Sequence, residues 1–312
     1  MKDFFLSVII PAYNEEAVLT QTIGRLTSVM EREEYHYELI FVNDGSKDAT
    51  LRLLEEASAK DSRIKYLSFS RNFGHQAAVS AGIDACSGDA VVIIDADLQD
   101  PPEVIPQMVA LWQDGNDVVY GKRKSRDGES FFKTFTAKAF YRILNSLSTV
   151  DIPLDTGDFR LIDRKVADVL RGLPEKNRFL RGLVSWIGFQ QAPCEFSRDA
   201  RAAGETKYTM KKMINLAIDG ILSFSSAPLR LMAKFGFLIV FISVALFIYT
   251  IVSLCLGSTA AGWASLMTVI TFFGGTNFVA IGLLGEYVAR IYDEAKGRPN
   301  YIVDKRGNFK DE

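Results

Sequence analysis

The chain has 312 residues, of which 48% are hydrophobic and 24% are charged, and its formal net charge is −2 at pH 7. This length allows one large domain with an appendage, or two modest domains. The nearly balanced charge excludes a broadly basic nucleic-acid-binding protein, so we expect no nucleic-acid partner.

The first 230 residues alternate apolar strand patterns with helical patterns. The predicted strands are residues 5–13, 37–44, 64–70, 90–97 and 117–123. The predicted helices begin near Glu15 and span about 45–61, 74–88 and 101–115. Such alternation predicts an α/β domain with a mostly parallel sheet, helices on both faces and ligands at the carboxyl ends of the strands.

Polar side chains cluster where each predicted strand ends. The pairs are Asn14 and Glu15, Asn43 and Asp44, Arg71 and Asn72, Asp95 and Asp97, and Lys122 and Arg123. Because the carboxyl ends of parallel strands meet at one edge of the sheet, these pairs together outline one site. His75 follows the third strand, and either contact with a substrate or simple packing would account for it.

The stretch "DADLQD" brings Asp95, Asp97 and Asp100 together directly after a buried strand. Like charges in one place favour a cation, and the chain contains no G-x-G sequence that could cradle a phosphate without one. Asp97, with Asp95 or the Gln99 amide, offers the hard oxygen ligands that suit Mg²⁺ or Mn²⁺. The alternative is a helix N-terminus carrying carboxylates that favour the helix dipole.

Two apolar runs without charge, residues 235–257 and 263–285, lie near the C-terminus. Each is long enough for a helix to cross a hydrocarbon core of roughly 30 Å. They predict a transmembrane hairpin within residues 230–290, and the alternative is a pair of buried helices in a soluble core. Basic residues flank the runs but are absent from the loop between them, which predicts that both chain termini are cytoplasmic. No secretory signal is expected at the start of the chain.

Two further segments combine apolar residues at helical spacing with basic residues. They are residues 130–147 and 208–229. Basic amphipathic helices of this kind lie in the headgroup plane of a membrane, although either segment could instead pack on the domain core.

Several motifs, in the same order along the chain, resemble the family-2 glycosyltransferases of the GT-A (Rossmann-like) fold. They are "SVIIPAYNEE", "FVNDGSKDAT", "SRNFGHQAAVSAG", "DADLQDPPE" and "TGDFRLIDR". The likeness is closer to the polyprenyl-phosphate branch, which includes bacterial GtrB-like enzymes and dolichyl-phosphate mannose synthases, and it extends to "GEYVARIYDEAKGRPNYIV".

This resemblance implies a domain map. Residues 1–207 would form the cytoplasmic catalytic domain, 208–229 a juxtamembrane helix, 230–290 two transmembrane helices, and 291–312 a cytoplasmic tail. It also implies a multi-pass protein of the bacterial inner membrane. The partners that it suggests are a second copy of the chain, in a dimer or tetramer, a flippase and a downstream glycosyltransferase.

The implied activity is the inverting transfer of one sugar from a nucleotide donor to polyprenyl phosphate at the cytoplasmic face. Glucose from UDP-glucose and undecaprenyl phosphate are the favoured pair, and UDP-GlcNAc and GDP-mannose are the alternative donors. An alternative of another class is a nucleotide-sugar-sensing module of a membrane channel or flippase. A processive polysaccharide synthase is disfavoured, since the chain has no Arg-Trp pair.

The resemblance also assigns roles to residues. Those implied at the nucleotide are Pro11, Ala12, Tyr13, Glu15, Asp44 and Asp95, and those implied at a divalent metal are Asp97 and Gln99. Asp158 matches the residue usually drawn as the catalytic base. An acceptor phosphate with a second pKa near 6 scarcely needs deprotonation, however, so Asp158 could instead orient the sugar.

The anionic acceptor needs cations near the carboxylates. The candidates are Arg123, Arg126, Lys133, Arg201 and Lys207, with Arg favoured for bidentate phosphate contacts. Arg123, Arg201 and Lys207 join Asp158 as implied catalytic residues, the last two in a loop that closes over the site. For Arg126 and Lys133 the alternative is a solvated helix start.

Overall fold

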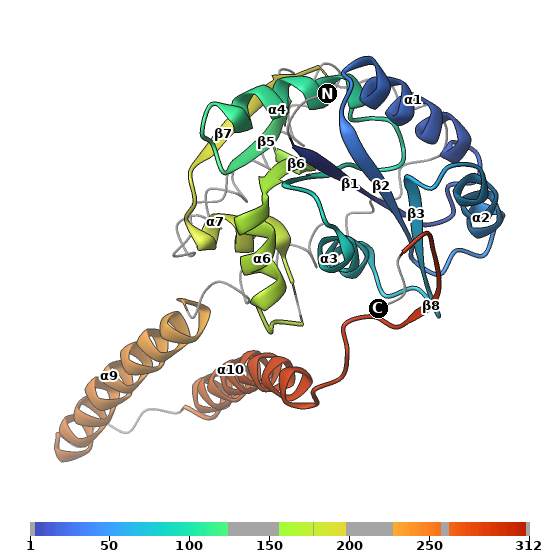
Figure 1. Cartoon of the computed structure of the whole chain (residues 1–312). Coiled ribbons are helices and arrows are strands. Elements are labelled where there is room, and N and C mark those ends of the chain that lie inside the picture. The colour runs from blue at the N-terminus through green and yellow to red at the C-terminus, as the bar shows by residue number, and fades with distance from the viewer. Residues whose placement is uncertain (1–3, 124–155, 177, 198–226, 257–261, 310–312) are drawn as a thin grey trace. The chain divides into compact units, whose positions relative to one another are not determined.

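The computed structural model describes residues 4–123, 156–176, 178–197, 227–256 and 262–309 (Figure 1). The chain divides into two compact units, each described by itself below. The first comprises Met1–Asn145, Val150–Ala217 and Pro299–Glu312, and the second comprises Ser146–Thr149 and Ile218–Arg298.

Eight strands form one sheet in the described part of the first unit. They are β1 (Phe5–Ala12), β2 (His36–Asn43), β3 (Ile64–Phe69), β4 (Ala90–Ile93), β5 (Val118–Arg123), β6 (Thr156–Asp163), β7 (Gln191–Phe196) and β8 (Val303–Gly307). Their order across the sheet is β7-β5-β6-β4-β1-β2-β3-β8. The pairs β4-β1, β1-β2, β2-β3 and β5-β7 are parallel, which confirms the predicted α/β fold with a mostly parallel sheet.

Three strands were not predicted, and two of them run antiparallel to their neighbours. Strand β6 lies between β4 and β5 and is antiparallel to both. Strand β8 is the outermost strand on one side of the sheet and pairs antiparallel with β3, and β7 is the outermost strand on the other side.

Helices cover both faces of the sheet, as expected. Their bounds are α1 (Leu19–Arg32), α2 (Thr50–Lys60), α3 (His75–Ala85), the 3₁₀ helix η1 (Pro102–Val104), α4 (Ile105–Gln113), α6 (Arg164–Gly172) and α7 (Leu180–Ile187). On one face, Leu6, Val8 and Ile10 of β1 share a buried core with residues of α1, α2 and α4. On the other face, Ile9 packs against α3 at Gly82.

The first helix begins later than predicted, at Leu19 rather than near Glu15. The backbone amides of Asn14, Glu15 and Glu16 bond instead to side chains of Ser46, Thr50 and Asp48. Asn14 also has φ of +54°, outside the right-handed helical region, so the helix does not begin here. The segment is held beside the loop that follows β2.

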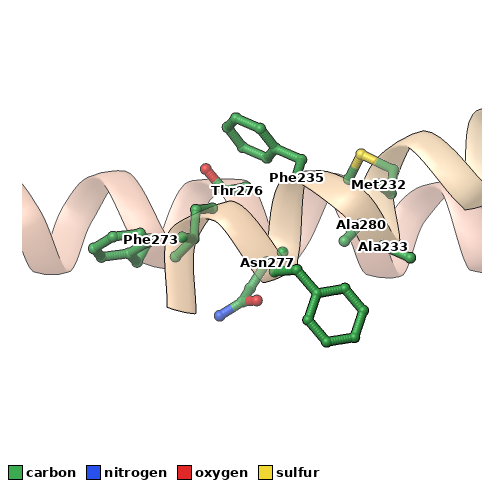
Figure 2. Close-up of a pocket in the computed structure, with 10 residues that line it drawn as sticks. Met232, Ala233, Phe235, Phe273, Thr276, Asn277 and Ala280 are labelled. Carbon is green, nitrogen blue, oxygen red and sulfur yellow. The ribbon is translucent and has the colours of Figure 1, made fainter. Parts of the chain in front are cut away.

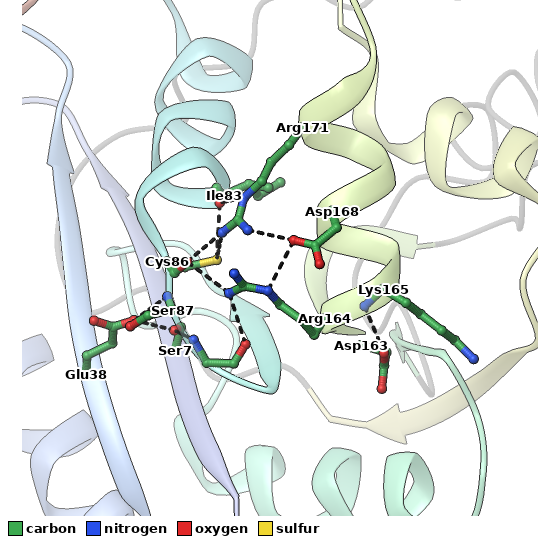
Figure 3. Close-up of polar contacts among 11 residues, drawn as sticks. Ser7, Glu38, Ile83, Cys86, Ser87, Asp163, Arg164, Lys165, Asp168 and Arg171 are labelled. Carbon is green, nitrogen blue, oxygen red and sulfur yellow. Dashed lines mark hydrogen bonds and ion pairs between the residues drawn. The ribbon is translucent and has the colours of Figure 1, made fainter.

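The arginines of α6 tie this helix to the end of α3 (Figure 3). Arg171 donates to the carbonyls of Ile83 (2.8 Å) and Cys86 (2.5 Å), and Arg164 donates to those of Cys86 (3.1 Å) and Gly88 (3.4 Å). A helix C-terminus leaves its last carbonyls without intrahelical partners, so these guanidinium groups satisfy the end of α3.

The second unit contains α9 (Ala227–Cys255) and α10 (Trp263–Ala295). Among the described residues, one segment is long and apolar enough to cross a membrane, Phe272–Ala295 of α10, and none of its tested window is buried. A cavity of about 500 Å³ between the two helices is lined mostly by apolar residues, including Met232, Phe235 and Phe273 (Figure 2). The predicted two-span hairpin is not shown and stays a prediction. The proposed interfacial helices, 130–147 and most of 208–229, lie outside the described residues.

Candidate active site

The register between β4 and β6 brings two distant carboxylates together. Ile93 pairs with Arg160, and because the strands are antiparallel, Asp158 at the start of β6 lies beside Asp95 just after β4. His75, the first residue of α3, lies between them. Its Nε2 is 3.1 Å from Asp95 Oδ1 and 3.7 Å from Asp158 Oδ2.

Asp158 forms a bidentate ion pair with Arg181 of α7. The Arg181 Nε and Nη2 atoms donate to the two carboxylate oxygens at 2.7 and 3.1 Å. Burial alone would raise the pKa of Asp158, but the Arg181 guanidinium, helped by His75 and Arg160, holds it well below its usual range. Asp158 is therefore ionised at neutral pH and is a weak base.

Arg160 is a second buried cation beside Asp158. It is 4% exposed, and its guanidinium donates to the carbonyls of Gly157 and Asp158. Burial lowers its pKa to about 10, against the opposing effect of Asp158, so it keeps its charge at neutral pH.

Asp95 lies among carboxylates. Its pKa is raised to about 6, first by burial and then by Asp158, Asp100 and Asp97, with His75 acting in the opposite direction. The like-charge crowding expected from the sequence is thus a property of the folded site. A cation placed here would relieve it.

The donor set around Asp97 fits a divalent ion with oxygen ligands. Asp97 Oδ1 accepts from the backbone N–H of Gln99 at 3.1 Å, across a turn in which Leu98 has φ of +57°. In the described part of the chain, no group of three or more His, Cys, Asp or Glu side chains is arranged to hold a metal. A carboxylate and an amide here suit an ion that takes its remaining ligands from a diphosphate, as Mg²⁺ commonly does.

At the end of β2, which β1 separates from β4, buried Asp44 holds the loop before α3. Its carboxylate accepts from the N–H of Phe73 (2.6 Å), the N–H of Gly74 (2.9 Å) and the side-chain amide of Asn72 (2.8 Å). Burial raises the pKa of Asp44 although these N–H donors lower it. Gly45, at φ +64°, lets the two loops meet, because a Cβ there would lie 2.4 Å from the Arg71 carbonyl carbon.

The predicted nucleotide residues of β1 lie at the same edge. Pro11 and Ala12 pair with the end of β2, and the Asp44 N–H donates to the Ala12 carbonyl at 2.9 Å. Tyr13 and Glu15 follow in the loop that is tied to the segment after β2. The structure thus brings these four residues, Asp44 and Asp95 to one edge of the sheet.

The predicted phosphate-binding cations stay a prediction. Arg123 is the last residue of β5, and its side chain is not among those described. Arg126, Lys133, Arg201 and Lys207 lie outside the described residues.

Sequence reasoning missed Arg160 and Arg181 altogether and left His75 open. Arg160 had a usable signal, because residues two apart on a strand share a face, and Asp158 stands two positions before it. Arg181 comes from a helix outside the strand-end pattern, so only the tertiary structure brings it to Asp158.

Comparison with known proteins identifies the family. The model for glycosyl transferase family 2 matches residues 7–171, which is more than half of the chain. The chain belongs to glycosyl transferase family 2. The site residues from Pro11 to Arg160 all lie within the matched segment, whereas Arg181 lies beyond it.

Relatives in this family match almost the full length of the chain. An uncharacterized glycosyltransferase of Bacillus subtilis (strain 168), YkcC, is 52% identical and covers 96% of this chain and 93% of its own. The SfII prophage-derived bactoprenol glucosyl transferase of Shigella flexneri is 42% identical, covering 97% and 99%. The prophage bactoprenol glucosyl transferase homolog of Escherichia coli (strain K12) is 40% identical, covering 96% and 98%.

Solved structures are more distant. The glucosyl-3-phosphoglycerate synthase from Mycobacterium tuberculosis, crystallised with Mn²⁺, UDP-glucose and phosphoglyceric acid, is 21% identical, with a TM-score of 0.46. It covers 70% of this chain and 78% of its own. The family assignment therefore depends on the sequence comparisons.

Proposed function

We propose that this protein transfers glucose from UDP-glucose to undecaprenyl phosphate with inversion at the anomeric carbon. The observation that carries the proposal is the full-length match to bactoprenol glucosyl transferases, at 42% identity over 97% of the chain. The arrangement of carboxylates at the sheet edge supports it, because a cation bound there would offset their repulsion and could hold the diphosphate of the donor.

The reaction is a single in-line displacement. A phosphate oxygen of the acceptor attacks the anomeric carbon while the bond from that carbon to the diphosphate oxygen breaks. The electron pair of the broken bond leaves with UDP, so the products are glucosyl polyprenyl phosphate and UDP. No proton has to be removed from a dianionic acceptor phosphate.

We assign Asp158 to orienting the sugar rather than to general-base catalysis. Its carboxylate is held by Arg181 at 2.7 Å and lies next to His75, and its low pKa makes it a poor proton acceptor. A fixed, ionised carboxylate can accept a hydrogen bond from a sugar hydroxyl throughout the displacement, which keeps the anomeric carbon in line for attack.

Asp97 and Gln99 would hold Mg²⁺ or Mn²⁺ at the diphosphate. The ion would stabilise the charge that develops on the leaving UDP. Asp95 would face the nucleotide, and Pro11, Ala12, Tyr13, Glu15 and Asp44 would contact its base and ribose. These nucleotide assignments are supported by the position of the residues at one edge of the sheet.

The acceptor phosphate would be bound by Arg123, Arg126, Lys133, Arg201 and Lys207. Its isoprenoid tail stays in the bilayer, so the protein must sit at the membrane. We propose a two-span hairpin with interfacial helices at 130–147 and 208–229, in the bacterial inner membrane with the catalytic domain in the cytoplasm. The apolar segment Phe272–Ala295 supports membrane association. A homodimer or tetramer, a flippase and a downstream glycosyltransferase remain proposed partners.

The test is transfer of radiolabelled sugar into organic-extractable lipid, with UDP-glucose, UDP-GlcNAc and GDP-mannose compared against one polyprenyl phosphate acceptor. We expect labelled lipid from UDP-glucose, its loss with EDTA, and its loss in Asp97→Ala. Asp114→Asn, which changes an exposed carboxyl at the end of α4, is the matched control and should keep wild-type activity. A protein that binds a nucleotide sugar but forms no labelled lipid would instead be a sensing module.

A further inference from the structure

The segment that follows α10 becomes part of the first unit's sheet. After α10 ends at Ala295, the sequence "GRPNYIV" leads into β8, which pairs with β3. Asn308 fastens the far end of this strand, since its side-chain amide donates to the carbonyls of Ser58 (2.6 Å), Ile64 (2.8 Å) and Asp61 (3.3 Å).

Tyr301, just before β8, joins two elements of the domain. Its ring stacks on buried Phe69 at the end of β3, with ring centroids 5.1 Å apart and an interplanar angle of 16°. Its hydroxyl donates to Asp84 of α3 at 2.8 Å. The loop formed by residues 70–74 joins the end of β3 to the start of α3, so Tyr301 contacts this loop's β3 side through Phe69 and the far, C-terminal end of α3 through Asp84.

The same segment contacts this loop directly. The carbonyl of Ile302 accepts from the N–H of Ser70 at 3.1 Å, and Phe69, under Tyr301, makes an edge-on contact with Phe73, with ring centroids 5.7 Å apart. Arg71 also contacts Phe73, with its guanidinium carbon 4.1 Å from the Phe73 ring centroid. The ring of Phe73 is thus connected to Tyr301 through one edge-on and one stacked contact, both made by Phe69.

Phe73 is also where the loop meets the candidate site. The N–H groups of Phe73 and Gly74 donate to Asp44, and the next residue, His75, reaches Asp95. A side chain near the C-terminus is therefore linked through two aromatic rings to the carboxylate at the end of β2. The loop that bonds to Asp44 is therefore in contact with the segment before β8.

We propose that Tyr301 is a positioning residue, which fixes the loop of residues 70–74 on Asp44 and so sets the affinity of the site for the nucleotide half of the donor. The inference rests on the proposed function for the identity of that donor. Tyr301 does not touch substrate, and it acts through Phe69 and Phe73. The phenol donates its hydrogen bond over the working pH range, because burial and Asp84 raise the pKa of Tyr301.

The test compares Tyr301→Ala, Tyr301→Leu and Tyr301→Phe with the matched control Asn308→Ala in the full-length protein. Loss of the ring stack should raise KM for UDP-glucose about tenfold in the Ala and Leu variants, since an aromatic pair and the contacts it organises are worth about a factor of ten. The KM for polyprenyl phosphate should not move. Tyr301→Phe keeps the stack and should stay within about twofold of wild type. Asn308→Ala should lower Tm and leave both KM values unchanged.

Hydrogen exchange and UDP binding by calorimetry give readouts that do not need turnover. The amides of Phe73 and Gly74 should exchange faster in Tyr301→Leu but not in Asn308→Ala, with UDP binding weakened in parallel. If Tyr301→Leu and Asn308→Ala lower Tm alike and neither changes the exchange rate of these amides or the affinity for UDP, the segment only stabilises the fold and the proposal is wrong. If wild type forms no glycolipid while the exchange and UDP results hold, the proposed function fails but the positioning role stands. A wild-type protein that binds no UDP overturns both.

Discussion

Removing Arg181 is the sharpest perturbation of the site. In Arg181→Met the buried Asp158 carboxylate loses a bidentate partner whose two hydrogen bonds measure 2.7 and 3.1 Å. The two side chains are 19% and 13% exposed, so water replaces little of what is lost. Removing one partner of a buried ion pair typically costs about 3–5 kcal/mol, because the other charge stays buried and unpaired.

The structure places the expected cost at the lower end of that range. Buried Arg160 remains close to Asp158 and His75 remains 3.7 Å away. We therefore expect about 3 kcal/mol of lost stability, which for a chain of 312 residues lowers Tm by roughly 5 °C. Activity should fall by roughly 100-fold, because Asp158 would no longer be held where the sugar needs it.

The stability that Arg181→Met loses should also depend on pH. The folded-state pKa of Asp158 is depressed, so its stabilising contribution is complete above the unfolded-state pKa of about 3.9 and is lost as pH falls below it. Without Arg181, burial dominates and the pKa rises. The stability difference between wild type and Arg181→Met should therefore be constant from about pH 8 to 6 and shrink as the solution is acidified towards pH 4.

The assay is thermal unfolding of detergent-solubilised protein in a double-mutant cycle with Asp158→Asn. The double variant should recover much of the stability that Arg181→Met loses, because no charge is then left unpaired. Arg178→Met is the matched control, since the guanidinium of Arg178 donates to the carbonyls of Glu175 and Leu173. A coupling energy below about 0.5 kcal/mol, or an Arg178→Met protein as unstable as Arg181→Met, would refute the reasoning.

Three further predictions follow from other contacts. Gly45→Ala should weaken UDP binding measured by calorimetry, because its Cβ would lie 2.4 Å from the Arg71 carbonyl carbon; unchanged affinity would show that the two loops adjust freely. Arg171→Ala should lower the free energy of unfolding by about 1.5–3 kcal/mol in denaturant titrations and leave KM unchanged, because it removes charged hydrogen bonds from the end of α3. Burial raises the pKa of Cys86 to about 11, so iodoacetamide at pH 7.5 should modify it only after unfolding, as followed by peptide mass spectrometry; rapid modification of the folded protein would contradict its burial.

The part of the fold that the sequence could predict is the part with a local pattern. Strands β1 to β4 are short apolar runs, each ending in polar residues, and their parallel arrangement follows from the helices between them. Strand β6, "TGDFRLID", is more polar than these runs, and its antiparallel insertion between β4 and β5 depends on segments far apart in the chain. Strand β8, "VDKRG", is too polar to be predicted from its own pattern, and it forms because the edge of β3 offers hydrogen-bonding partners.

The candidate site likewise has one part that the sequence could predict and one part that it could not. The cluster of Asp95, Asp97 and Asp100 follows one strand and could be predicted from its position. Arg181 could not, because it reaches Asp158 from a helix that the sheet pattern does not place. The start of α1 was predicted too early, because Asn14 has φ of +54° and is bonded to the neighbouring loop.

The central claim is single-sugar transfer to a polyprenyl phosphate, and mass spectrometry of the lipid product tests it most directly. The full-length protein is incubated with UDP-glucose, undecaprenyl phosphate and Mg²⁺, and the molecular mass of the extracted lipid is compared with that of the acceptor. The account predicts one product, heavier than the acceptor by a single hexose residue, formed in step with UDP release. Release of free glucose and UDP with the acceptor unchanged, or a ladder of products carrying several sugars, would contradict it.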